Sequence, residues 1–157
     1  MRIALAPLRK RAAVVLESLR SADKSVGLVI VGGRAMRALN RQFRNIDETT
    51  DVLSFPSDPF PAGEGSDVND SEIDSIPARE FSDLGDVVVS IDEAVRQAEE
   101  DGVSLEVAVD RLFIHGVLHL HGFDHAAARG AKRMRREEDR LLELVHGSGI
   151  PAYAAPE

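Results

Sequence analysis

The chain of 157 residues and 17.1 kDa fits one domain, expected to span residues 1–157, that can bury a core of its own. It has no cysteine, which excludes disulfides and thiolate metal sites and suits a reducing cytoplasm, and no apolar run approaches the roughly 18 residues of a transmembrane helix. The formal net charge of −8 argues against a nucleic-acid partner when taken whole, but residues 1–45 hold ten Lys and Arg against two acids, a net of +8. A basic face is therefore compatible with the composition.

The first half of the chain predicts helices alternating with strands. The apolar run that follows the basic residues 9–11 is too short for an export signal and has helical spacing, which predicts a core helix. Residues 26–31 form a continuous apolar run, rich in β-branched side chains, that predicts a buried strand. A second helix is expected next, with Met36, Leu39 and Phe43 on its inner face. Residues 51–55 predict a short strand that ends before a proline.

The second half begins with a segment rich in Pro, Gly, Ser and acids, residues 57–83. Its composition predicts a flexible, acidic surface loop without catalytic groups. A strand is predicted at residues 86–91, followed by a helix that ends near Gly102. Ser104 can cap a long, largely buried helix that keeps its apolar periodicity into a histidine-rich segment, and a last helix is predicted over residues 129–146.

The histidine-rich segment carries the clearest chemical signal in the chain. His115 and His119 are one helical turn apart, so a helix presents both imidazoles on one face. Gly122 can end that helix and turn the chain so that His125 approaches the same point. Three imidazoles on one Zn²⁺ ion leave a fourth position for water, which is typical of a catalytic metal site. Nickel, copper and iron also accept imidazole, so the spacing does not exclude them.

The ligand spacing is that of the metzincin zinc proteases, with one difference. Those proteases carry a glutamate after the first histidine as general base, and this chain has Gly116 there. A proton acceptor must therefore come from elsewhere. Asp124 is one candidate for a catalytic role, either as base or as a partner that fixes the tautomer of an imidazole. His121 lies about 200° around the helix from His119 and is expected to face away.

Two long motifs resemble the YbeY family of bacterial metal-dependent endoribonucleases. One is HGVLHLHGFDH at residues 115–125, the other is LNRQFRNIDETTDVLSFP at residues 39–56, and LGDV at residues 84–87 lies between them. The resemblance extends from about Val26 to Val145. It implies a zincin-like α+β fold: one domain with a small mixed sheet of about three or four strands and about five helices. The metal ligands would lie on a long buried helix and on the turn after it.

The same resemblance implies a function and a set of site residues. It implies one zinc ion held by the three motif histidines, and a cytoplasmic endoribonuclease that acts on single-stranded RNA in 16S rRNA 3′-end maturation and in ribosome quality control. The family's functional arginine falls on Arg44. Its planar, always-charged guanidinium suits the charge that develops on phosphate oxygens during cleavage. The alternative for Arg44 is an ordinary surface salt bridge with Asp47 or Asp51.

Three functions are open at this stage. An endoribonuclease would use the histidines for metal, and Arg44 with other cations of residues 1–45 for the RNA backbone. A zinc peptidase fits the ligand spacing but lacks the glutamate base. A non-catalytic ribosome assembly factor would use zinc to stabilise its fold and a basic face to bind ribosomal RNA or protein. No membrane partner is expected, and the oligomeric state is open.

Overall fold

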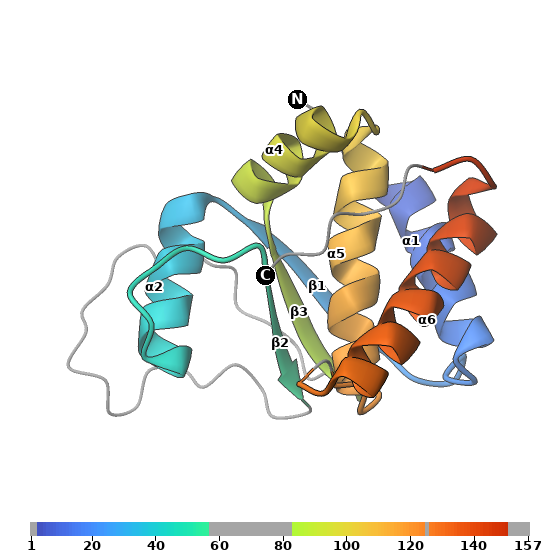
Figure 1. Ribbon diagram of the computed structural model, residues 1–157, viewed down its shortest axis with the longest axis horizontal. Helices are drawn as coiled ribbons and strands as arrows, with labels where there is room; N and C mark the ends of the chain where they lie inside the picture. Colours follow the sequence, from blue (N-terminus) through green and yellow to red (C-terminus); the bar gives the residue numbers. More distant parts are fainter. Residues whose placement is uncertain (1–2, 57–82, 125, 151–157) are drawn as a thin grey trace.

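The structure, a computed structural model, describes residues 3–56, 83–124 and 126–150. Within these ranges lie five helices and three strands (Figure 1): α1 Leu5–Ser18, β1 Gly27–Val31, α2 Gly33–Arg44, β2 Val52–Pro56, β3 Gly85–Ser90, α4 Ile91–Asp101, α5 Leu105–Leu120 and α6 Ala128–His146. The predicted α+β class is confirmed, and the elements begin and end within about two residues of the predicted ones. The acidic loop predicted at residues 57–83 lies outside the described residues up to position 82.

The three strands form one mixed sheet in the order β1-β3-β2 (Figure 1). β1 runs parallel to β3, with Val29 opposite Val88, and β2 runs antiparallel to β3, with Ser54 opposite Val87. All six residues of the central strand β3 are buried. A strand covered on both faces has no solvent side, which explains why its sequence is apolar without alternation.

Alternate residues of β3 point into two separate parts of the core. Val87 and Val89 pack with apolar residues of α1, α4, α5 and α6, whereas Val88 packs with Met36 and Leu39 of α2. Successive side chains of a strand point to opposite faces. The helix α2 therefore covers one face of the sheet, and the layer of α5, α6 and α1 covers the other, as Figure 1 shows.

The helix α5 is the central element of that second layer. Ser104 caps it by accepting a hydrogen bond from the backbone N–H of Val107, and eleven of its sixteen residues are buried. It contacts α4, α6, β2 and β3, so its position is fixed from several sides. Side chains near its C-terminal end are consequently held in a rigid frame. Neither α5 nor another helix in the described ranges combines the length and the apolar character needed to cross a membrane.

Candidate metal centre

His115 and His119 lie side by side near the end of α5, as their spacing predicts. Their Nε2 atoms are 3.1 Å apart, and the ring centroids are 4.7 Å apart with the ring planes at 78°. Both side chains are half-buried. The two imidazoles therefore direct the same ring nitrogen to one point that solvent can reach.

The other nitrogen of each ring is held by an acceptor. His115 Nδ1 lies 2.5 Å from Oε1 of Glu138 on α6, and His119 Nδ1 lies 3.0 Å from the backbone carbonyl of Phe123. A carbonyl or carboxylate oxygen accepts, so each Nδ1 carries the proton, and in the neutral ring the lone pair is on Nε2. Such partners select the tautomer in which an imidazole can bind a metal ion.

This donor set fits a metal ion. Two Nε2 lone pairs that face each other at 3.1 Å repel unless a cation or a proton lies between them. Within the described ranges no group of three or more His, Cys, Asp and Glu gathers as a metal site. The third predicted ligand, His125, lies outside the described residues, so the structure shows two of the three predicted ligands.

Glu138 is a member of the site that the sequence motif did not reveal. It occupies a position on α6 that is four residues from Met134 and three from Leu141, both of which are buried in the core. Residues at these spacings share one face of a helix. The sequence does contain one signal for Glu138: a carboxylate on the apolar face of a helix indicates that it has a buried partner.

The chain turns directly after the histidine pair. α5 ends at Leu120, and Gly122 adopts a φ of 90°, a conformation that favours glycine. The predicted role of Gly122 as the residue that ends the helix is confirmed. Two residues on, an Asp124 carboxylate oxygen accepts a hydrogen bond from the backbone N–H of Ala126 at 2.9 Å. The Asp124 side chain thereby binds the backbone two residues further along, and its catalytic role stays a prediction.

Gly116 brings α5 close to the sheet. A Cβ atom at this position would lie 2.5 Å from Cγ1 of Val87 and 3.0 Å from Oγ of Ser54, so a side chain here would force these neighbours to shift. The backbone carbonyl of Gly116 also accepts a hydrogen bond of 3.0 Å from the hydroxyl of Ser54 on β2. The missing protease glutamate is thus consistent with the packing, because the first side-chain atom at this position would already meet side chains of the sheet.

Arg44 is the last residue of α2 and is exposed. Its Nη2 donates a hydrogen bond of 3.0 Å to the backbone carbonyl of Ser54. The predicted alternative partners have other contacts: Asp47 pairs with Arg37 and Arg41, and Asp51 accepts from an amide side chain. Ser54 therefore links two parts of the predicted site, because its carbonyl binds Arg44 and its hydroxyl binds α5.

His121 faces away from the pair, as expected from its position on the helix. Its Nδ1 lies 2.9 Å from the carbonyl of Val117, and its Nε2 lies 2.8 Å from the hydroxyl of the buried Ser21. The carbonyl fixes the proton on Nδ1, so Nε2 accepts from the hydroxyl. His121 therefore connects the end of α1 to the end of α5.

The basic segment of residues 1–45 does not form one face. α1 and α2 lie on opposite sides of the sheet (Figure 1), and Arg11 of α1 is paired with the buried Asp110. On α2, a hydrogen bond from Arg37 lowers the pKa of Asp47, and Arg41 adds to this effect. The positive charge of residues 1–45 is therefore divided between two faces, and among the described residues of α2, Arg34 and Arg44 are the exposed cations without a carboxylate partner.

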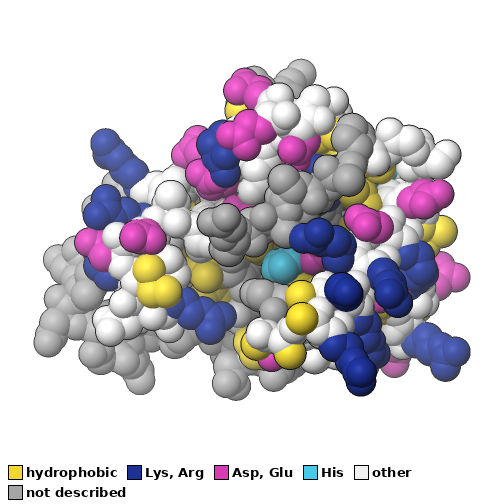
Figure 2. Space-filling view, in the orientation of Figure 1, with side chains coloured by type: hydrophobic (Ala, Val, Ile, Leu, Met, Phe, Trp, Pro, Cys, Tyr) yellow, Lys and Arg dark blue, Asp and Glu magenta, His cyan; other side chains and the backbone are white. Residues whose placement is uncertain are grey.

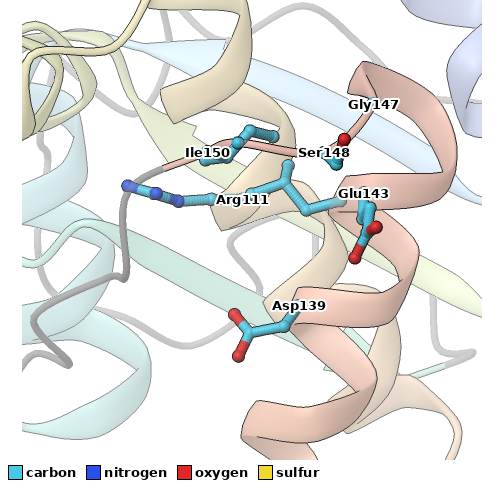
Figure 3. Close-up of a pocket in the computed structure, with 8 residues that line it drawn as sticks. Arg111, Asp139, Glu143, Gly147, Ser148 and Ile150 are labelled. Atoms are coloured by element: carbon cyan, nitrogen blue, oxygen red, sulfur yellow. The ribbon is translucent and has the colours of Figure 1, made fainter.

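A cavity of about 250 Å³ lies elsewhere, between α5, α6 and the residues that follow α6. Figure 3 shows Arg111 reaching into this region from α5, while Asp139 and Glu143 project from α6. Arg111 is paired with Asp101 at 2.9 Å. The lining of the cavity includes neither His115 nor His119, so the cavity is separate from the candidate metal centre.

Comparison with known proteins identifies relatives along almost the whole chain. Residues 4–146 match the model of the family described as Endoribonuclease YbeY. A protein of that name from Anaeromyxobacter sp. (strain Fw109-5) is 40% identical over 150 residues, which cover 96% of this chain and 68% of the relative. Another, from Thermus thermophilus, is 39% identical over 141 residues, which cover 87% of this chain and 88% of the relative.

A solved structure has a similar fold. The solution structure of a protein from Thermotoga maritima superposes with a TM-score of 0.59 at 26% sequence identity. The match covers 91% of this chain and 81% of the other. The arrangement of helices around a small mixed sheet is therefore shared with a known protein.

Proposed function

The chain belongs to the YbeY family, and from that premise we propose that it is a zinc-dependent endoribonuclease specific for single-stranded RNA. Endoribonuclease activity in ribosomal RNA processing is the function that its family and its relatives support. We place this activity in the cytoplasm, in 16S rRNA 3′-end maturation and ribosome quality control, and assign it to one domain of residues 1–157. The observation that carries the proposal is the pair of Nε2 atoms, 3.1 Å apart, whose rings are both anchored through Nδ1.

The ligand set of the proposed site consists of His115, His119 and His125. A bound Zn²⁺ ion would supply a Lewis acid that polarises a phosphate oxygen or lowers the pKa of a water molecule. Glu138 and the Phe123 carbonyl hold the first two imidazoles in the tautomer that offers Nε2. They also stop the rings from rotating, so the ligands are in place before a metal ion arrives.

Arg44 supplies the phosphate contact in this mechanism. A guanidinium has five N–H donors, and one of the two Nη groups of Arg44 is directed to the Ser54 carbonyl. The remaining donors are exposed and can bind phosphate oxygens. The Ser54 hydroxyl also binds the Gly116 carbonyl. Ser54 therefore fixes the position of the guanidinium relative to α5, the helix that carries the histidines.

The packing at Gly116 argues against the peptidase alternative. Peptide hydrolysis in the related zinc proteases uses the glutamate at this position as base. Here a side chain would meet Cγ1 of Val87 at 2.5 Å from its Cβ atom. The assembly-factor alternative predicts that the histidines stabilise the fold and do not take part in cleavage.

The decisive experiment measures zinc content and cleavage of a single-stranded RNA for the wild type, His119→Ala and Arg44→Ala. We expect the wild type to bind one zinc ion and to cut the RNA. His119→Ala should lose zinc and activity, and Arg44→Ala should keep zinc and lose activity. Folded wild-type protein that carries stoichiometric zinc and leaves the RNA uncut would refute the nuclease. A folded His119→Ala protein that still supports ribosome maturation would favour the assembly factor.

A further inference from the structure

The first turns of α6 carry a cluster of positive charge that the family motifs do not include. Residues 129–136 contain five cations and no acid: Arg129, Lys132, Arg133, Arg135 and Arg136. We call these five residues the α6 basic face. All five are exposed, and within the described parts of the chain none of them forms an ion pair within 4 Å of a carboxylate, although the charge of Arg135 acts on Asp139 one turn further along. By contrast, Arg140 on the same helix is bound to Glu137 and to Ser18.

This cluster does not serve the stability of the helix. The N-terminal end of a helix carries partial positive charge and favours acids, yet the first turn of α6 has none and no side chain caps it. Arg129, Lys132 and Arg136 are also three or four residues apart, so these like charges are neighbours and repel one another. An external anion is therefore the natural partner of the α6 basic face.

The α6 basic face adjoins the histidine pair. Arg135 lies one turn before Glu138, the residue that holds His115, so both side chains project from the same part of α6. Figure 2 shows Lys and Arg side chains gathered over α6, near a histidine side chain that is visible at the surface.

Arg133 connects the cluster to the second histidine. Its guanidinium carbon lies 4.9 Å from the centre of the Phe123 ring, and the Phe123 carbonyl holds His119. The ring that the guanidinium covers and the carbonyl that holds His119 belong to the same residue, Phe123, which follows α5. The α6 basic face therefore lies next to Phe123 and Glu138, the residues that hold the two imidazoles.

We propose that the α6 basic face binds the phosphate backbone of single-stranded RNA on one side of the histidine pair. This assignment rests on the proposed function, which supplies the RNA. A row of exposed cations matches the repeated charge of a nucleic-acid backbone and contacts it without reading sequence. α6 contains no aromatic residue on which a base could stack, so the interaction is electrostatic. Arg44 would contact the strand from the other side, at the end of α2.

The test compares two variants that remove the same charge. One is the triple variant Lys132→Gln, Arg135→Gln and Arg136→Gln on α6. Its control is the triple variant Arg9→Gln, Lys10→Gln and Lys24→Gln, which neutralises three exposed cations on and after α1. Both are made in the full chain loaded with zinc. Binding of a labelled 2′-O-methyl single-stranded RNA, which resists cleavage, is measured by fluorescence anisotropy over a range of salt concentrations.

The α6 triple variant should bind the RNA at least about tenfold more weakly at low salt, because three phosphate contacts are lost. The slope of log affinity against log salt should become shallower by about 2, since each contact to a single strand contributes about 0.7. The α1 control should bind like the wild type. A single pair sharpens the test: Arg136→Gln should weaken binding, whereas Arg140→Gln, whose guanidinium is already bound within the protein, should not.

Two results would overturn the proposal. One is equal affinity and equal salt slope for the α6 triple variant and the wild type. The other is loss of binding to vesicles of phosphatidylglycerol and phosphatidylcholine without loss of RNA binding, which would assign the α6 basic face to a membrane surface. Misfolding is checked separately by the thermal unfolding midpoint, which should not fall, because the substitutions remove repulsion.

Failure of this proposal is distinguishable from failure of the nuclease function. RNA binding that depends on α6, in a protein that leaves RNA uncut, would refute the nuclease and keep the proposed binding surface. RNA cleavage together with an unchanged α6 triple variant would keep the nuclease and refute the binding surface.

Discussion

The Nδ1 atom of His115 on α5 lies 2.5 Å from the Oε1 atom of Glu138 on α6. The Glu138 side chain is 16% exposed, so water does little to weaken this contact. A carboxylate in this place orients the imidazole and keeps the proton on Nδ1. α6 therefore takes part in the candidate metal centre, although it contributes none of the predicted ligands.

Glu138→Ala should lower the affinity for zinc about 10- to 100-fold, which is the usual effect of removing a partner that orients a ligand histidine. Glu138→Gln should have a smaller effect, since the amide oxygen can still accept from Nδ1 but carries no charge. Zinc affinity is measured by competition with a chromogenic chelator.

The matched control for Glu138 is the adjacent Glu137→Ala. Glu137 binds Arg140 at the surface and has no contact with the histidines. Its removal should leave zinc affinity unchanged. Equal zinc affinity in Glu138→Ala and Glu137→Ala would show that the contact to His115 has no part in metal binding.

Gly116→Ala should destabilise the protein by about 1–3 kcal/mol, the usual range for overpacking a core. The sign of this change in unfolding free energy is informative, because replacing glycine by alanine inside a helix otherwise stabilises a protein by about 0.5–1 kcal/mol. The added Cβ would meet Val87 at 2.5 Å. Urea unfolding of Gly116→Ala, Val87→Ala and the double variant measures the coupling, and additive effects would contradict a direct clash.

Much of this site could be predicted from the sequence because its signals are local. The positions of His115 and His119 follow from a four-residue spacing on a helix, and Gly122 marks the end of that helix. The three consecutive valines at residues 87–89 likewise favour a buried strand, whichever strands lie beside it.

The parts that could not be predicted depend on contacts between distant residues. Glu138 reaches His115 across 23 positions of the chain, and Ser54 reaches Gly116 across 62. No periodicity within one element reveals such a pairing. Charge counting along the sequence failed for the same reason: residues 1–45 are strongly basic, but the sheet separates α1 from α2 (Figure 1).

Asp110→Ala should destabilise the protein by about 3–5 kcal/mol, the cost of removing one partner of a buried ion pair. Asp110 is 2% exposed, and its Oδ2 lies 2.5 Å from both Arg11 Nε and His146 Nε2. These contacts join α1, α5 and α6, so their loss leaves the Arg11 guanidinium and the His146 ring without this acceptor inside the helical layer. Chemical denaturation measures the change.

The control for Asp110 is an ion pair at the surface. Glu100 binds the exposed Arg96 four residues before it on α4, and Glu100→Ala should cost less than about 1 kcal/mol. Similar losses in Asp110→Ala and Glu100→Ala would show that burial does not strengthen the Asp110 contacts.

Asp139→Asn should make the stability less dependent on pH. Burial, followed by the charge of Glu138, raises the pKa of Asp139 above its usual value, against the opposing effects of Arg135 and Arg111. Such a carboxyl binds its proton more tightly in the folded chain, so its stabilising contribution is complete below the unfolded pKa and is lost as the pH rises through the folded pKa.

At neutral pH the ionised Asp139 is therefore unfavourable, and Asp139→Asn should raise the unfolding free energy. The gain should be about 0.5 kcal/mol or less, because solvent screens a carboxylate that is largely exposed. Urea unfolding at several pH values from acid to neutral checks the sign. A variant that is less stable than the wild type at neutral pH would contradict the expected direction.

Arg44→Lys should lower kcat/KM for RNA cleavage by about 10- to 100-fold while the zinc content stays at the wild-type value. The guanidinium binds the Ser54 carbonyl with one group and keeps further donors for a phosphate. An ammonium that binds the same carbonyl cannot also offer a planar pair of donors to two phosphate oxygens.

If Arg44 binds the phosphate more strongly in the transition state than in the bound substrate, the substitution lowers kcat. If it binds both equally well, the substitution raises KM instead. Arg34→Lys, at the exposed start of the same helix, is the matched control and should keep wild-type kinetics. Unchanged kinetics in both Arg44→Lys and Arg44→Ala would reduce Arg44 to a surface residue that fastens α2 to β2.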